Sequence, residues 1–104
     1  MQYAVIYIRE DRKIENYPLS EEQERLALAF ANENRLEILK TFADNDGAQR
    51  KIDTLIDFCL SNGIGTVVML NYKVLSHKSI WRVKIAKKFH ENGISIVFAE
   101  KQES

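Results

Sequence analysis

The feature that most limits what this chain can fold into is an alternation of strand-like and helix-like segments, repeated over its 104 residues. Short apolar runs predict strands at 3–8, 36–43, 66–70 and 94–98. Apolar residues at helical spacing predict helices at 20–34, 48–60 and 77–91. Crossovers of this length join parallel strands and are right-handed. We therefore expect an α/β three-layer sandwich in the order βαβαβαβ, with residues 1–104 as a single domain.

The predicted helix ends carry their own signals. Asn62-Gly63-Ile64 and Asn92-Gly93-Ile94 repeat one joint, in which a left-handed glycine ends a helix and a buried strand follows. Ser20 and Gln23 have capping-box spacing, and Ser76 is the expected N-cap of the last helix, with a hydrophobic staple between Leu75 and Ile80. The residues expected on buried helix faces are Leu26, Ala27, Phe30 and Ala31, then Ile52, Leu55, Ile56, Cys59 and Leu60.

Charge is segregated along the chain although its sum is zero. The 15 Lys and Arg residues balance the 15 Asp and Glu residues. No acidic residue lies between Asp57 and Glu91, so the six Lys and Arg residues at 58–90 give that block a formal charge of +6 and leave −6 elsewhere. The neutral sum therefore does not exclude a partner that is nucleic acid or an acidic protein.

The last predicted helix carries most of this basic character. A helical projection places Val83, Ile85, Ala86 and Phe89 on an apolar side. The other side holds Trp81, Lys84, Lys87 and Lys88, a candidate surface for contact with nucleic acid or a protein partner. A solvated lysine face beside a partly buried tryptophan explains the same pattern.

Ligands of an open parallel sheet bind at the carboxyl ends of its strands. Three segments follow strands here: Arg9-Glu10-Asp11, Asp44 to Gly47 with Arg50, and Asn71 to Val74. Asp11, Asp44 and Asp46 offer the carboxylate oxygens that Mg²⁺ prefers, which leaves a phosphoryl-transfer site open as an alternative. The simpler interpretation is a turn at Asp44 to Gly47 that caps the second helix.

Several other classes are disfavoured. The chain has no glycine-rich phosphate loop, and His77 and His90 lack a cysteine partner for zinc, so we expect no cofactor and no metal. The single cysteine, Cys59, fits a core position. No apolar run approaches the length of a membrane span, and residues 1–3 lead directly into a strand. We expect a reducing, cytoplasmic setting and no membrane contact.

Four segments occur in an order that matches the motifs of a known family. They are Ala4-Val-Ile-Tyr7-Ile-Arg9, Tyr17-Pro-Leu-Ser20-Glu-Glu-Gln23, Asp44-Asn-Asp-Gly47-Ala-Gln-Arg50, and the stretch from Thr66-Val-Val-Met-Leu70 through Leu75-Ser76-His77 to Phe89-His-Glu-Asn-Gly93-Ile-Ser-Ile-Val97. With them the chain resembles the serine site-specific recombinases, which include resolvases and invertases. The resemblance implies a resolvase-like domain connected with DNA recombination.

The resemblance also implies a site that this chain does not complete. In the family a serine attacks the DNA phosphodiester and arginines hold the phosphate. The serine position falls on Asp11, and the Asp-Arg-Leu-Ser-Arg motif falls on residues 73–77, with Lys73 for its aspartate and Val74 and His77 for its arginines. Arg9 and Arg50 remain, and the capping context of Ser20 argues against a nucleophilic role. We therefore expect a pseudoenzyme with no catalytic residues.

Family members continue into a dimerisation helix and a DNA-binding domain, and we expect neither in these 104 residues. The hypothesis is a domain that acts by association with itself as a homo-oligomer, with a related recombinase, or with DNA. A structural dimerisation module without nucleic-acid contact is the other alternative.

Overall fold

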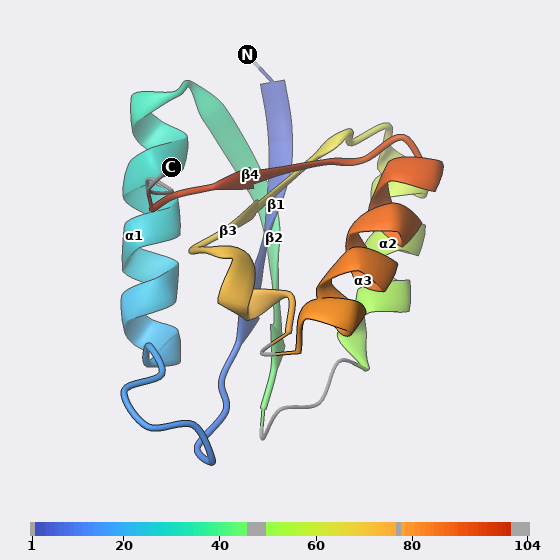
Figure 1. Cartoon of the computed structure of the whole chain (residues 1–104). Coiled ribbons are helices and arrows are strands. Elements are labelled where there is room, and N and C mark those ends of the chain that lie inside the picture. The colour runs from blue at the N-terminus through green and yellow to red at the C-terminus, as the bar shows by residue number, and fades with distance from the viewer. Residues whose placement is uncertain (1, 46–49, 77, 101–104) are drawn as a thin grey trace.

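The structure, a computed structural model, describes residues 2–45, 50–76 and 78–100. Within them it forms a parallel sheet in the order β2-β1-β3-β4, from β1 (Gln2–Arg9), β2 (Leu36–Asp44), β3 (Thr66–Met69) and β4 (Ser95–Phe98). Figure 1 shows α1 (Ser20–Glu33) on one face and α2 (Lys51–Asn62) and α3 (Ser79–Glu91) on the other. A short 3-10 turn, η1 (Tyr72–Val74), follows β3. The expected α/β three-layer sandwich is confirmed.

The central strand β1 is buried on both faces, as its lack of alternation predicts. Residues 4–9 are all buried. Ala4, Ile6 and Ile8 pack in the layer under α1, whereas Val5 and Tyr7 belong to the larger core under α2 and α3. Both layers of the core therefore depend on β1, and Arg9 lies where this strand reaches the carboxyl edge of the sheet.

The outer strand β2 contains a bulge. Ala4 lies opposite Ile38 but Val5 lies opposite Lys40, so Leu39 is an extra residue and is exposed. The bulge leaves β2 alternating only in part, which is the imperfect pattern seen in its sequence.

The two glycine joints are confirmed, and the structure adds a third. Gly63 and Gly93 have φ of 65° and 70°, and the amides of Ile64 and Ile94 bond back to Cys59 and Phe89. After α1 the same conformation is adopted by Arg35, with φ 57°. In all three joints an asparagine amide donates to the carbonyl four residues earlier, through Asn34, Asn62 and Asn92.

The first helix begins at Ser20 as predicted, but the predicted N-caps Ser20 and Ser76 were wrong. Ser20 is the first residue of α1 and its hydroxyl donates to Glu10, while the capping-box partner Gln23 turns toward β1. Ser76 lies three residues before α3 and accepts a bond from the amide of Lys78 instead of capping the helix. The helix predicted from residue 48 begins at Lys51, and residues 46–49 lie outside the described chain.

Three apolar residues expected to be buried are exposed. Leu60 is 55% exposed, Ile80 64% and Val83 68%, so Ile80 and the buried Leu75 do not form the expected staple. On α3 the buried residues are Ile85 and Phe89. Arg82 shares their helix face, which turns Val83 outward.

Candidate functional site

The carboxyl edge of the sheet is organised around Arg9. Its guanidinium donates from Nε to the carbonyl of Val74 at 2.9 Å and from Nη2 to the carbonyl of Lys73 at 2.8 Å. A third donor, Nη1, lies 3.5 Å from Oδ2 of Asp11. The residue is only 1% exposed. Arg9 therefore connects the end of β1 to the turn that follows β3.

Tyr17 and Gln23 enclose Arg9 from the other side. The ring of Tyr17 lies 5.3 Å from the guanidinium carbon, and its hydroxyl donates to the same Lys73 carbonyl at 3.0 Å. Burial raises the pKa of Tyr17 to about 12, and the positive charge of Arg9 opposes this rise. The side chain of Gln23 accepts from the backbone amide of Arg9 and donates to its carbonyl and to that of Pro18.

Asp11 is buried within this network. Oδ1 accepts the amide of Lys13 at 3.1 Å, and Oδ2 faces Arg9. The Asp11 carbonyl also accepts the amide of Ile14. The carboxylate thus shapes the turn after β1 and neutralises the buried guanidinium.

Asp44 forms a second network at the end of β2. It accepts the hydroxyl of Tyr7 at 2.7 Å and the amide of Lys51, at the start of α2, at 3.0 and 3.2 Å. Burial and the neighbouring carboxylate raise the pKa of Tyr7 far above its ordinary value. Asp44 therefore caps α2, as the simpler interpretation of this turn predicts.

Asp11 and Asp44, the two described members of the candidate metal site, belong to no metal-binding cluster within the described part of the chain. Residues 2–45, 50–76 and 78–100 contain no group of three His, Cys, Asp or Glu side chains placed to hold a metal ion. Asp46 lies outside the described residues. Asp11 and Asp44 each bind protein groups instead.

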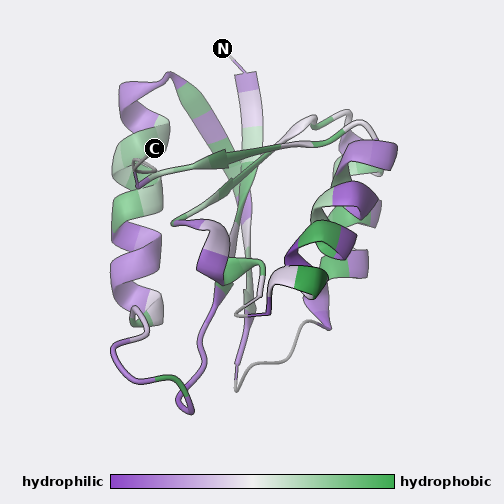
Figure 2. Ribbon diagram, viewed as in Figure 1, coloured by the Kyte–Doolittle hydropathy of each residue, from purple (hydrophilic) through white to green (hydrophobic). Residues whose placement is uncertain are grey.

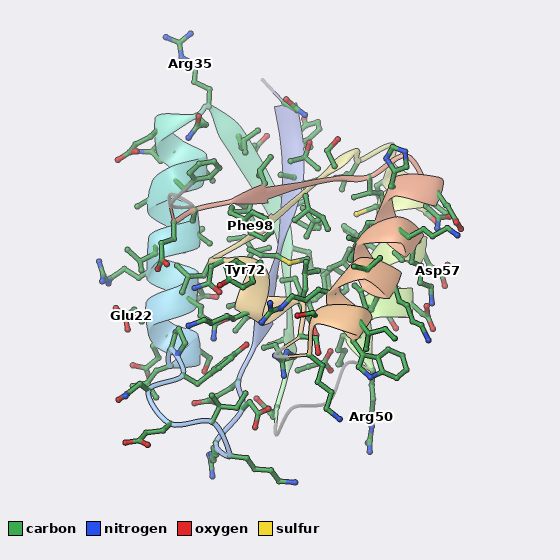
Figure 3. The ribbon with its side chains drawn as sticks, viewed as in Figure 1. Glu22, Arg35, Arg50, Asp57, Tyr72 and Phe98 are labelled. Carbon is green, nitrogen blue, oxygen red and sulfur yellow. The ribbon has the colours of Figure 1, made fainter. Side chains whose placement is uncertain are left out.

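The remaining candidate positions are dispersed. Arg50 is exposed, and Figure 3 shows its side chain directed away from the sheet at the lower end of the molecule. Asn71 caps η1 by accepting the amide of Lys73, whose own side chain is exposed, and Val74 is buried. His77 lies outside the described residues. The structure thus joins Arg9 and Asp11 but leaves Arg50 at the surface.

Tyr17, Gln23 and Arg82 belong to this edge although the sequence did not assign them to it. Arg82 donates to the carbonyl of Ser76, and its guanidinium lies 4.4 Å from the ring centre of Tyr72. The usable signal for Gln23 was its position on the buried stripe of α1, four residues before Ala27. Nothing in the local sequence of Arg82 indicated that it faces η1.

The predicted contact surface on α3 is divided. Trp81, Lys84 and Lys88 line a hollow of about 230 Å³ together with Ile52, Asp53 and Ile85. Lys88 forms an ion pair with Asp53 of α2, and the ammonium of Lys84 lies 4.8 Å from the centre of the Trp81 ring. Lys87 points toward Glu91 at 3.7 Å. Asp53 of α2 and Glu91 at the end of α3 therefore reduce the positive charge that the acid-free block suggested.

Three solved structures show the same arrangement of strands and helices. The first is the N-terminal catalytic domain of TP901-1 integrase, with 20% sequence identity and a TM-score of 0.74 over 94% of this chain and 77% of that one. The second is the C-terminal catalytic domain of ISC1926 TnpA, an IS607-like serine recombinase, with 18% identity and a TM-score of 0.74 over 98% of this chain and 70% of that one. The third is a resolvase family site-specific recombinase from Streptococcus pneumoniae, with 16% identity and a TM-score of 0.76 over 95% of this chain and 72% of that one. This is the fold of the serine recombinase catalytic domain.

No model of a protein family and no curated protein matches the sequence. At 16–20% identity the three structures establish the serine recombinase fold and leave the chemistry of this chain to its own residues. In the described residues, this version of the serine recombinase fold contains no helix long and apolar enough to cross a membrane.

Proposed function

We propose that this chain is a recombination-related domain in which the phosphoryl-transfer site of the serine recombinase fold has become a structural connection. It acts by non-covalent association with DNA, with a related recombinase or with a second copy of itself. The observation that supports this proposal most directly is the burial of Arg9, whose guanidinium donates to two backbone carbonyls and pairs with Asp11.

An arginine that stabilises a transferring phosphate must offer its planar pair of donors to the substrate. Arg9 directs Nε and Nη2 to protein carbonyls instead, and turning it toward DNA would break both of these hydrogen bonds and its ion pair with the buried Asp11. Such a rearrangement costs several kcal/mol, on the order of 3–5 for a broken buried pair. Arg9 is therefore poorly placed to bind phosphate.

The position of the family's nucleophilic serine has also lost its function. Asp11 stands at the position that the resemblance gives to the attacking serine, and its carboxylate is held by Arg9 and the amide of Lys13. A carboxylate repels the phosphodiester that it would have to approach. Ser20 is poorly suited as a replacement, because its hydroxyl lies against Glu10, a second carboxylate that would repel an approaching phosphodiester.

The proposed contact surface for DNA or a protein partner is the outer side of α3, with Trp81, Lys84, Lys87 and Lys88. Trp81 is about half exposed and supplies a stacking surface, and among the described residues Lys84 forms no ion pair, in contrast to Lys87 and Lys88. Buried Cys59, a free thiol, suits the reducing cytoplasm in which we place the protein.

Covalent capture tests the loss of chemistry. The protein is incubated with supercoiled plasmid and with duplexes of randomised sequence, then denatured and resolved for protein-bound DNA. An active serine recombinase on its own site is the positive control. We expect no species that survives denaturation. A resistant adduct that disappears in Asp11→Ala or Ser20→Ala would overturn the proposal.

A further inference from the structure

The two edges of the sheet differ in how they are protected. Unpaired edge strands usually carry charges, bulges or prolines that prevent pairing with another strand. β2 has the bulge at Leu39 and exposed Glu37 and Lys40. β4, Ser95–Phe98, has no charged residue and no bulge, and Figure 2 shows it as apolar over most of its length. In Figure 1 it forms the nearest edge of the sheet, between the two helical layers.

The backbone of β4 offers a defined set of unused groups. The amides of Ser95 and Ala99 donate to Gly65 and Met69, both at 2.8 Å, on the β3 side. Because donors alternate along a parallel strand, Val97 also faces β3, and the amide and carbonyl groups of Ile96 and Phe98 point away from it. Within residues 2–45, 50–76 and 78–100, two donors and two acceptors are thus presented on the side of β4 that faces away from β3.

The side chains of β4 are arranged to continue both layers. Ile96 and Phe98 pack against the core under α2 and α3, and Val97 packs against the core under α1. All three are only partly buried. Beside Val97, a hollow of about 360 Å³ opens between Phe30, Thr66 and Ser95. A strand added at this edge would complete the burial on both faces.

We propose that β4 is a self-association surface, through which two copies of this chain pair antiparallel about a twofold axis at Val97. In this register Ile96 and the partner subunit's Phe98 exchange both backbone hydrogen bonds, and the symmetric pair does the same. On one face of the sheet each Ile96 then pairs with the partner's Phe98, and on the other face the two Val97 side chains pair with each other. Such cross-strand pairs stabilise antiparallel sheets.

Charge and symmetry favour a second copy as the occupant. Residues 95–99 carry no charge, so the register places no like charges opposite one another. Glu100 would lie across from the partner's Ile94 and away from the partner's Glu100. The chain has a net charge of zero, which removes long-range repulsion between copies. A twofold pairing of this kind also closes on itself and does not propagate into a fibre.

This inference rests on the association part of the proposed function and is independent of its chemistry. Sedimentation velocity and light scattering from micromolar to millimolar concentration measure the assembly state of the full chain. We expect a reversible dimer. Hydrogen exchange compared between dilute and concentrated protein should show added protection at the amides of Ile96 and Phe98.

Two variants identify the surface. Val97→Lys places two ammonium groups opposite each other at the axis, and Ile96→Pro removes an outward amide without touching the bonds to β3. Each should weaken the dimer at least tenfold. Leu39→Lys makes the same kind of change on the opposite edge and should leave it unchanged. Circular dichroism and thermal unfolding verify that every variant is folded.

A wild-type chain that stays monomeric at millimolar concentration overturns the inference, and so does a dimer that persists in folded Val97→Lys and Ile96→Pro. Neither result produces a covalent DNA adduct, which is the outcome that would overturn the proposed function. The two failures can therefore be told apart.

Discussion

At the scale of single residues, the side chain of Arg9 connects distant parts of the chain. It ends the central strand, yet its side chain bonds to a turn 64 residues later in the chain. Buried arginines need their donors satisfied, and here two carbonyls, a carboxylate and the ring of Tyr17 supply the partners. A residue type associated with phosphate binding thus serves to hold the backbone at the edge where a substrate would enter.

Replacing Arg9 should therefore reduce stability. Arg9→Ala removes the donor of the buried Val74 carbonyl, one of the two donors to the Lys73 carbonyl and the buried cation beside Asp11, and we expect the free energy of unfolding to fall by about 3–5 kcal/mol. Urea denaturation followed by circular dichroism measures the loss. Arg50→Ala, at an exposed arginine, is the control and should change it by less than about 0.5 kcal/mol. Equal, small effects would show that Arg9 is available for another role.

The raised pKa of Tyr17 predicts that the protein loses stability at alkaline pH. Its pKa is raised from 10.0 to about 12 by burial, so folding favours the neutral phenol. The stabilisation is fully present below pH 10 and is lost as the pH rises toward 12. We expect the stability advantage of wild type over Tyr17→Phe to shrink by on the order of 1 kcal/mol across this interval.

The measurement is urea unfolding of both proteins at pH 8 and at pH 11 to 12. Tyr3→Phe, at an exposed tyrosine, controls for the loss of one hydroxyl. An advantage that stays constant through this interval would contradict the role given to the buried phenol.

At the level of elements, all three helices end in one kind of joint. An asparagine amide bonds back into the last turn, and a residue with positive φ reverses the chain into the next strand. Two joints use glycine for this conformation, which it adopts without steric cost. The joint after α1 uses Arg35, whose side chain makes the same conformation unfavourable.

These joints predict opposite effects of two substitutions. Arg35→Gly should stabilise the protein by about 0.5–1 kcal/mol, and Gly63→Ala should destabilise it by about 1–2 kcal/mol, because only Gly63 is already free of strain at φ 65°. Gly65→Ala is a matched control, since an added Cβ would meet the Gly93 carbonyl at an ordinary 3.6 Å. Thermal and urea unfolding measure all three. A stabilising Gly63→Ala would refute this explanation of the joints.

Strands and helix C-termini could be predicted from the sequence, whereas the helix N-caps could not. Apolar runs such as 3–8 and the Asn-Gly-Ile joints are local signals with one structural solution each. Ser20 and Ser76 can cap a helix, but other hydrogen-bond partners compete for their hydroxyls. Here the hydroxyl of Ser20 donates to Glu10, and that of Ser76 accepts the amide of Lys78. The partial burial of Arg82 and the exposure of Val83 depend on how α3 is rotated, which follows from contacts outside α3 such as those of Arg82 with Ser76 and Tyr72.

Over the whole molecule, packing redistributes the charge that the sequence segregates. The block 58–90 has no acidic residue, but α2 brings Asp53 beside Lys88 of α3. Lys87 forms an ion pair with Glu91. Lys84, next to Trp81, is left as the cation of this surface best able to meet a phosphate.

DNA retention tests this surface. Lys84→Glu should lower retention on duplex DNA at low salt roughly tenfold, and the wild-type binding should weaken steeply as salt rises. Filter binding or electrophoretic mobility shift measures both. Arg25→Glu makes the same charge change on exposed α1 and is the control. Equal retention by all three proteins would favour a dimerisation module without nucleic-acid contact.

The sequence by itself determined the order of elements, the parallel α/β architecture, the glycine joints and the resemblance to serine recombinases, because each follows from local periodicity or from motifs in a fixed order. Only the tertiary structure decided that Arg9 is held by Val74 and Lys73, that Asp44 accepts the hydroxyl of Tyr7, and that β4 is an outer strand of the sheet formed by the described residues. Those properties come from contacts between segments far apart in the chain, where the available donors, charges and edges are set by packing and not by neighbours in sequence.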